Sequence, residues 1–439
     1  MSRSRSRWAL RTFVAGQGVN ALGSMVSSLA LPLVAVYRLH ATTLVVGALE
    51  AIEWLPAVLI GLPVGALLDR HQPRARTVMM AANLGQAAAV AAVPAAAALG
   101  LLSVGVLVAA AATAGMFTVW FQAGYNPYLR ALVDRDDYLT ATSRTRGAQS
   151  FATLTGPALA GALVEAVGAA TTVLADAASF LLSFVSLAVL PAAPPTPASE
   201  AATSLTTQIR DGLAYLWNSR LLRTLAWAAA SINLFLTAIG AIEIVFLARN
   251  LHTPAGWIGV LIALGGLGGL GGLGGSLLAT PLERRYGLPR LARTTVIATA
   301  PLALLMPLTS PGPGLILFAL AGPPTSLGIA VVSISFSTLR LQHCPPHLLA
   351  RVTTTSRTLT ATTIPAGALI GGALGQLLTN RTALLALAVG YLTLGSLLLA
   401  TPSLKNLPSP RQPDLAAPQP TRAHNAADPT VPQTKTRHP

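Results

Sequence analysis

The sequence predicts an all-α integral membrane protein with twelve transmembrane helices in two six-helix, pseudo-symmetric bundles. Its 439 residues are 53% hydrophobic and 10% charged, whereas soluble domains average about 25% charged residues. Apolar stretches recur at lengths of roughly 20 residues, enough to cross a bilayer core of about 30 Å. Similar short phrases also recur about 210 residues apart, as in transporters built from parallel repeats. The composition excludes an ordinary soluble enzyme and a largely disordered chain.

Twelve segments meet the length needed to span a membrane. The first follows four arginines, and its apolar run over residues 13–36 is longer than the core of a signal peptide. We therefore expect it to be a retained helix. The segments lie near residues 12–36, 44–68, 77–99, 101–123, 146–167, 171–190, 224–248, 256–280, 291–309, 313–336, 357–379 and 382–401.

The basic residues predict the orientation of these segments. With both termini in the cytoplasm, all of the 29 Lys and Arg residues lie on the cytoplasmic side except Arg38, Arg249 and Arg381. This asymmetry follows the positive-inside rule. The net charge of +15 is therefore a topology signal, which predicts contact with anionic lipid headgroups and no nucleic-acid partner. We expect a multi-pass protein of the cell inner (plasma) membrane.

Proline and polar stretches divide the chain. Residues 1–190 and 223–402 are the two predicted six-helix bundles. Between them, residues 191–222 open with a Pro cluster and continue as an amphipathic stretch over 205–217, which is typical of a helix at the cytoplasmic membrane surface. The polar, Pro-rich residues 403–439 are expected to form a disordered cytoplasmic tail.

Several phrases resemble the major facilitator superfamily over nearly the whole chain, to about residue 405. The superfamily's loop signature is matched by Gly65, Asp69, Arg70, Arg74 and Arg76. Phrases at residues 29–32, 156–161, 176–183 and 212–217 are similar to the branch of enterobactin-exporter-like and macrolide-efflux-like proteins. The resemblance implies the major facilitator fold and transport by alternating access.

This resemblance implies functions for two motifs of the sequence. Gly65, Asp69, Arg70 and Arg74 would form a cytoplasmic gate, with Asp69 latching the start of the segment 357–379. The alternative is that the arginines are only positive-inside charges. Gly156, Pro157 and Gly161 match the antiporter motif, in which this chain has small residues at other glycine positions. The alternative is a helix kink with no bearing on transport direction.

Acidic residues inside predicted spans are costly and are candidates for function. These are Glu50, Glu53, Asp176 and Glu243. Glu53 is the deepest, and we hypothesise that it binds a proton, a cationic substrate, or each in turn; Glu50 lies on the same helical face. Glu243 is the alternative coupling residue, and Asp176 is expected to make structural hydrogen bonds. The alternative for Glu53 is a hydrated charge in an outer vestibule.

Other polar and aromatic residues are candidates for lining a cavity: Gln17, Asn20, Trp54 and Asn233. The one cysteine, Cys344, allows no intrachain disulfide or Cys-based metal site. The glycine-rich stretch 265–275 lacks the Lys-Ser/Thr of a phosphate loop. We therefore expect no metal, no cofactor and no enzymatic activity.

The sequence as a whole predicts a secondary active transporter, acting as a monomer. It would export a small amphipathic molecule, such as a drug, a macrolide-like metabolite or a siderophore, by proton antiport with alternating access. One alternative is a proton-coupled metabolite importer. Another is a non-transporting membrane sensor of the same fold.

Overall fold

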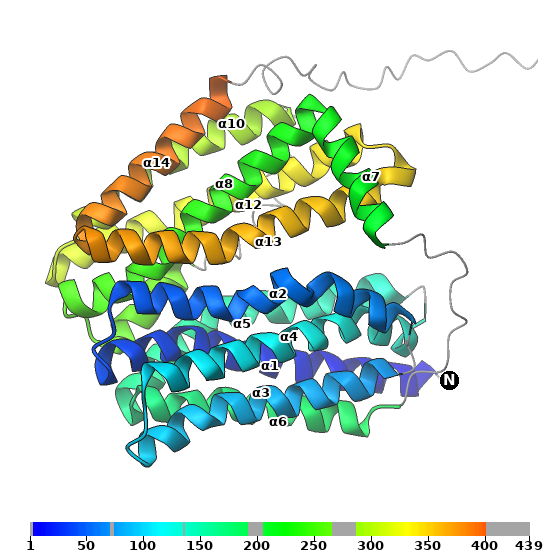
Figure 1. Ribbon diagram of the computed structural model, residues 1–439, viewed down its shortest axis with the longest axis horizontal. Coiled ribbons are helices and arrows are strands. Elements are labelled where there is room, and N and C mark those ends of the chain that lie inside the picture. Colours follow the sequence, from blue (N-terminus) through cyan, green and yellow to red (C-terminus); the bar gives the residue numbers. More distant parts are fainter. Residues whose placement is uncertain (1–2, 71–73, 135–136, 192–204, 266–286, 401–439) are drawn as a thin grey trace, which may run out of the picture.

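The computed structural model describes residues 3–70, 74–134, 137–191, 205–265 and 287–400, which form helices joined by short turns (Figure 1). The expectations for the Pro cluster, for the glycine-rich stretch beyond Gly265 and for the tail fall outside these residues. The described helices before the linker are α1 (Arg3–Arg38), α2 (Thr43–Arg70), α3 (Ala75–Ala98), α4 (Val104–Leu132), α5 (Tyr138–Val167) and α6 (Ala169–Val189).

The linker and the second half of the chain are also helical where they are described. They comprise α7 (Leu205–Asn218), α8 (Arg220–Val245), the short η3 (Phe246–Asn250), a helix at Ala255–Gly265, α10 (Leu288–Thr299), η4 (Ala300–Leu304), α11 (Leu305–Leu308), η5 (Gly312–Leu315), α12 (Ile316–His343), α13 (Pro346–Leu377) and α14 (Asn380–Ala400).

Ten helices in the described part of the chain are long and apolar enough to cross a membrane. The predicted segment 256–280 is described only as the helix Ala255–Gly265, so the count of twelve stays a prediction. Several helices exceed their predicted segments: α5 begins at Tyr138 rather than 146, and α4 ends at Leu132 rather than 123. Hydropathy detects the part of a helix inside the bilayer, whereas backbone hydrogen bonding continues through the polar residues beyond it.

Short caps and turns fix where helices begin. Ser103 accepts a hydrogen bond from the backbone N–H of Val106, 3.3 Å away, at the start of α4. Ser219 caps α8 in the same way through Leu222, at 3.4 Å. Such caps satisfy N–H groups that have no partner within the helix. Gly168, with φ of 85°, is the single residue between α5 and α6, a conformation that strongly favours glycine.

The helices sort into two groups. Helices α1–α6, here the N-terminal helices, pack mainly against one another, with α1 against α5 and α6 and α3 against α4 and α6. Helices α8–α14, here the C-terminal helices, include the pairs α8 with α13 and α10 with α12. Figure 1 shows the two groups one above the other, with α2 and α13 facing each other between them.

The linker helix α7 packs on α13. A Cβ built on Gly212 would lie 2.6 Å from Thr355 Oγ1 and 2.8 Å from the Arg351 carbonyl oxygen. Leu216 of α7 is buried in a cluster with the C-terminal helices. The predicted amphipathic helix therefore exists; Leu216 packs against protein, whereas Leu213 and Trp217 are exposed.

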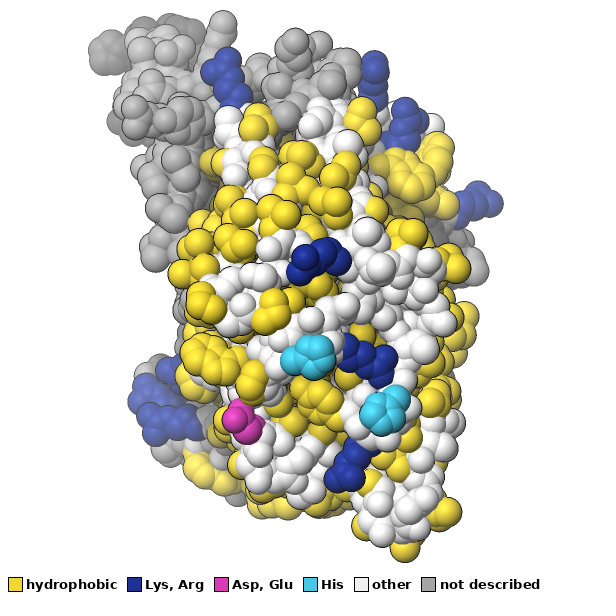
Figure 2. All heavy atoms as spheres, turned by 90° about the vertical axis from the view of Figure 1, so that its left-hand side faces the viewer, with side chains coloured by type: hydrophobic (Ala, Val, Ile, Leu, Met, Phe, Trp, Pro, Cys, Tyr) yellow, Lys and Arg dark blue, Asp and Glu magenta, His cyan; other side chains and the backbone are white. Residues whose placement is uncertain are grey.

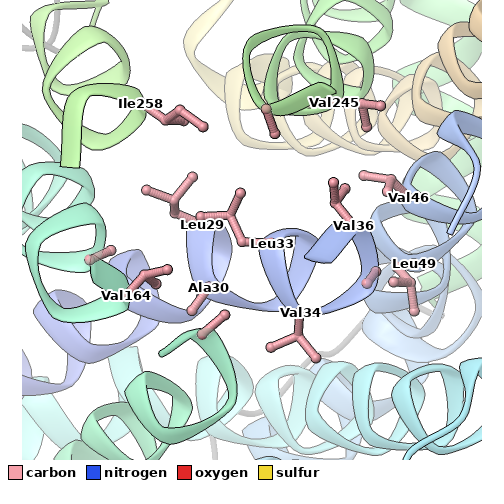
Figure 3. Packing of buried hydrophobic residues seen from close by; sticks show 14 of the residues in the cluster. Leu29, Ala30, Leu33, Val34, Val36, Val46, Leu49, Val164, Val245 and Ile258 are labelled. Atoms are coloured by element: carbon pink, nitrogen blue, oxygen red, sulfur yellow. The ribbon is translucent and has the colours of Figure 1, made fainter. Parts of the chain in front are cut away.

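At one end of the molecule the two groups share a hydrophobic cluster. Figure 3 shows Leu29 and Leu33 of α1 pointing toward Val245 of α8 and Ile258 of the helix Ala255–Gly265. All four side chains are almost completely buried. Because apolar burial is favourable in proportion to area, this cluster holds the groups together. We call this end, which carries the turns at residues 39–42 and 378–379, the closed end.

Backbone contacts reinforce the closed end. A Cβ built on Gly372 of α13 would lie 3.0 Å from the Leu44 Cα of α2, and one on Gly47 would lie 3.1 Å from the Gly372 Cα. Side chains at these positions would force α2 and α13 apart. Small residues allow such close approach of membrane helices.

At the opposite end the hydrophobic core divides. One buried cluster contains only N-terminal helices, with Phe13 and Tyr128 at its centre; another contains α7 and C-terminal helices, with Leu225 and Phe336. A Cβ on Gly65 of α2 would meet nothing within 4 Å. The ribbons of α2 and α13 diverge toward this end in Figure 1. We call it the open end.

Candidate functional site

A cavity of about 310 Å³ lies between the two groups of helices. It is lined from both sides, mainly by apolar and hydroxyl-bearing residues, together with three glutamates. No Lys or Arg belongs to its described lining. The lining residues that matter here are Ser24, Ser27 and Ser28 of α1, Glu50, Glu53 and Trp54 of α2, Pro157 of α5, and Gly240, Glu243 and Ile244 of α8.

The glutamates form one electrostatic cluster. Glu50 interacts with the charges of both Glu53 and Glu243. Glu50 and Glu53 come from α2, whereas Glu243 comes from α8, so the cluster joins the two groups of helices. Carboxyls gathered in this way can take up protons or a cationic group.

Close packing of α4 positions Glu53. Gly115 of α4 lies directly against the Glu53 carbonyl, with no room for a side chain between the helices. One turn later Pro56 lies inside α2; a proline there cannot donate the hydrogen bond that the Ile52 carbonyl would otherwise accept. The Glu53 side chain is exposed to the cavity that it lines.

Asp176 of α6 is set back from this cavity. It is 2% exposed, and Ser179 donates to its carbonyl oxygen at 2.8 Å and to its carboxylate Oδ1 at 3.2 Å. A Cβ on Gly23 of α1 would lie 2.9 Å from the same carboxylate oxygen. Asp176 interacts electrostatically with Glu53, but its hydrogen bonds with Ser179 are within its own helix.

A second cavity, of about 630 Å³, continues from the first among the C-terminal helices. The two share Pro157, Gly240 and Glu243 in their linings. Its remaining lining is largely apolar, with Phe318 and Tyr391 among the larger residues. Glu243 therefore lies where the two spaces meet.

A third cavity, of about 850 Å³, shares Leu236 and Ser333 with the second. We call it the vestibule, because its lining includes residues from the halves of α5, α12 and α13 that lie toward the open end. Among them are Arg146, Arg340 and Arg357. The three spaces together lead from the open end to the glutamates.

Only part of the predicted gate lies within the described structure. Asp69 and Arg70 end α2, but their side chains are outside the described residues. Arg74 is exposed at the start of α3. Arg76 donates from Nε to the Leu187 carbonyl at 2.7 Å and from Nη2 to the Ala188 carbonyl at 2.6 Å, so it binds the C-terminal end of α6.

The predicted antiporter motif packs α5 on both sides. Gly156 lies against Met25 of α1. Gly161 faces Gly259 of the helix Ala255–Gly265, and a Cβ on either glycine would lie 2.9 Å from the other's Cα. Gly259 also faces the Pro157 carbonyl. The motif thus contacts both α1 and a C-terminal helix.

The four predicted cavity residues have different surroundings. Trp54 lines the first cavity. Asn233 lines the vestibule and donates to the Thr360 carbonyl and to Thr363 Oγ1, each at 3.2 Å. Gln17 and Asn20 are buried on α1, outside the linings of the three cavities.

Sequence reasoning missed the polar contacts of the closed end. Glu165 of α5 accepts a hydrogen bond from the Gly256 N–H at 3.0 Å. Thr43 donates to Asn380 Oδ1 at 2.9 Å, and Asn380 Nδ2 donates to Asn250 at 2.8 Å. These residues lie near predicted helix ends, where polar side chains are usual, so composition gave no signal. Among the described residues, no group of His, Cys, Asp or Glu could hold a metal ion.

The chain belongs to the Major Facilitator Superfamily, because the model of that family matches residues 13–364. It is therefore a multi-pass membrane protein of this superfamily, whose members are generally not enzymes. The family resemblance drawn from the sequence is confirmed.

Among curated proteins, the chain is similar to the multidrug efflux pump Tap of Mycobacterium tuberculosis, at 27% identity over 274 residues, covering 61% of this chain and 63% of Tap. It is also 28% identical over 262 residues to the uncharacterized MFS-type transporter YfiS of Bacillus subtilis, covering 58% of this chain and 60% of YfiS. The chain thus aligns with less than two thirds of each relative.

Solved structures share the fold at low identity. The nucleoside transporter NupG superposes with a TM-score of 0.71 at 14% identity, covering 91% of this chain and 100% of NupG. A bacterial homologue of the iron transporter ferroportin, in its inward-facing state, gives a TM-score of 0.67 at 17% identity, covering 91% of this chain and 100% of the homologue.

Proposed function

We propose that the chain exports a small amphipathic molecule by proton antiport with alternating access. The observation that carries this proposal is the first cavity, in which Glu50 and Glu53 of α2 face Glu243 of α8. A site shared by both halves can be exposed to either side of the membrane as the halves rock.

The charge of the cavity supports coupling to protons. Carboxylates that lie close together repel one another, and the described lining offers no basic residue to neutralise them. The cavity therefore favours occupants that bring positive charge, either protons or a cationic group of the substrate. Exchange between these two occupants is antiport.

We assign the open end to the cytoplasm, so the structure would be the inward-facing state. All but three of the 29 Lys and Arg residues follow this assignment. Figure 2 views the closed end, whose surface is mainly hydrophobic and neutral, with a few separate Lys, Arg, His and acidic side chains. Residues 1–190 and 223–402 would then rock about the linker 191–222.

In the outward-facing state the open end would close. We propose that Asp69, at the end of α2, then latches the first turn of α13, where a helix N-terminus favours negative charge. Gly156, Pro157 and Gly161 would keep α5 closely packed during this movement. The lining, which is apolar with scattered hydroxyls and three glutamates, supports a small amphipathic substrate, as does the similarity to Tap, a multidrug efflux pump.

Transport by inside-out vesicles containing the protein tests this proposal. An imposed proton gradient should drive uptake of some member of a panel of dyes, macrolides and siderophores. Glu53→Gln should abolish gradient-dependent uptake, and Glu243→Gln should reduce it. Asp69→Asn should slow it by weakening the latch. Asp134→Asn, a carboxyl in the exposed turn after α4, is the control and should transport normally.

Three results would count against the proposal. Uptake that is unchanged in both glutamate variants would show that these cavity glutamates do not couple transport to protons. Accumulation of a metabolite only in right-side-out vesicles would favour the importer. No flux of any compound by folded protein would favour the sensor.

A further inference from the structure

The vestibule at the open end is strongly basic. Arg146 reaches it from α5, whereas Arg340 and Arg357 reach it from α12 and α13. Arg340 and Arg357 are close enough to interact as like charges. No Asp or Glu belongs to the described lining of this cavity, so the lining itself does not neutralise the guanidinium groups.

Ser and Thr residues lie beside Arg340 on α12 and beside Arg357 on α13. On α12, Ser333, Ser337 and Arg340 are spaced four and three residues apart, which places them on one helical face. On α13, Thr353, Ser356, Arg357 and Thr360 form a second such stripe. Ser333 and Ser337 are exposed to the cavity. Each stripe thus combines an arginine with hydroxyl groups, of which that of Thr360 donates to the Ser356 carbonyl at 3.0 Å.

We infer that the vestibule binds an oxyanion, a carboxylate or phosphate group carried by a small molecule or a lipid. A guanidinium presents parallel N–H donors that match the two oxygens of such a group. Hydroxyls of the two stripes would complete its hydrogen bonds. The cavity, at about 850 Å³, has room for an organic anion rather than an inorganic ion alone.

The positive-inside rule accounts for the side of the membrane on which these arginines lie, but not for their position in the lining of a cavity. That rule requires basic residues in cytoplasmic loops, whereas Arg340 is half-buried within α12 and lines a space between helices. Charged groups in that position generally serve a ligand or a partner.

The site also joins the two groups of helices. Arg146 belongs to the N-terminal helices and the other two arginines to the C-terminal helices. Closing the open end brings these like charges closer, which is unfavourable. A bound oxyanion neutralises them and so stabilises the closed form. Binding at this site does not require that the chain export anything, so its test is separate from that of the proposed function.

Thermal unfolding of the full-length protein in nanodiscs of neutral lipid provides the test. Sodium phosphate and sodium benzoate are titrated against sodium chloride at matched ionic strength. Phosphate or benzoate should raise the melting temperature to a plateau, because a ligand that binds only the folded state stabilises it. Arg340→Gln and Arg357→Gln should each weaken the apparent affinity about tenfold, the value of one charged hydrogen bond or more.

Controls separate the site from a general effect of charge. Arg290→Gln removes an exposed arginine from α10, outside the three cavities, and should leave the titration unchanged. Arg357→Lys keeps the charge but loses the paired donors, so it should bind more weakly than wild type and more tightly than Arg357→Gln. Equal titrations in wild type, Arg340→Gln and Arg357→Gln would overturn the inference.

A second set of nanodiscs containing phosphatidylglycerol identifies the source of the oxyanion. If the lipid headgroup occupies the site, this lipid should stabilise wild type but not Arg340→Gln, and free phosphate should have no further effect. If a soluble anion is the ligand, the phosphate titration should be the same in both lipids. Stabilisation by neither source would overturn the inference.

Discussion

The Glu165 carboxylate on α5 accepts a hydrogen bond from the backbone N–H of Gly256, 3.0 Å away. Gly256 is in the first turn of the helix Ala255–Gly265, so an acidic side chain of the N-terminal helices caps a C-terminal helix. The dipole of a helix favours negative charge at this position. The contact therefore joins the two groups of helices at the closed end by a charge as well as by packing.

Removing this charge should loosen the closed end. Glu165→Gln keeps an acceptor but loses the charge–dipole interaction, worth about 0.3–1 kcal/mol at an exposed site. The fraction of molecules in which the two groups of helices have separated at this end should rise about twofold to fivefold. Distances between spin labels at Leu101 and Leu308, both exposed near this end, measure that population in a Cys344→Ala background. Asp134→Asn is the matched control, and an unchanged distribution in Glu165→Gln would refute the prediction.

Gly161→Ala should destabilise the protein by forcing two backbones apart. The added Cβ would lie 2.9 Å from the Gly259 Cα and 3.1 Å from its nitrogen, and such overpacking costs about 1–3 kcal/mol. Gly147→Ala on the same helix meets nothing within 4 Å and should not lower stability. Thermal unfolding in detergent compares the two. A melting temperature for Gly161→Ala equal to that of Gly147→Ala would show that the helices are not in close contact.

Asn380→Ala should open the turns at the closed end. Asn380 accepts from Thr43 at 2.9 Å and donates to Asn250 at 2.8 Å, so the substitution breaks both bonds. Each is worth about 0.5–1.5 kcal/mol. Hydrogen exchange followed by mass spectrometry should be faster in peptides covering residues 39–46 and 246–253. Peptides of α3 are the internal reference, and unchanged exchange in the first two regions would contradict the prediction.

The two arginines that follow the α2–α3 turn should differ in their effect on stability. Arg76 binds two carbonyls at the end of α6, where a cation is favoured by the helix dipole, whereas Arg74 is exposed. Arg76→Gln should lower the free energy of unfolding by about 1–2 kcal/mol, and Arg74→Gln should leave it nearly unchanged. Chemical unfolding of both variants measures the difference; equal losses would refute a structural role specific to Arg76.

Hydropathy predicted the class and the positions of most of the helices that the structure describes. The predicted segment 44–68 is α2, Thr43–Arg70, and the predicted segment 171–190 is α6, Ala169–Val189. Apolar length is a direct physical requirement of a bilayer, so it can be read from one sequence. Family membership followed from short motifs and is confirmed by the family model.

The site was predictable only in part. The acidic candidates Glu50, Glu53 and Glu243 were selected because charges in spans are costly, and the structure gathers them around one cavity. Arg340 and Arg357 were counted only as topology charges, because a sequence does not give the rotation of α12 relative to α13. The Glu165–Gly256 contact joins residues 91 apart in the chain, and its prediction requires the positions of both helices.

The contact between Gly161 and Gly259 has a kinetic consequence. Interlocked side chains must change rotamer before two helices can separate, and each such change adds an energy barrier to the separation. Two bare backbones that meet face to face have no rotamers to change. Such a contact can break and re-form without any rearrangement of side chains. In the proposed cycle, this contact would therefore add less resistance to opening of the closed end than the side chains of Leu29 and Leu33, which pack against Val245 and Ile258.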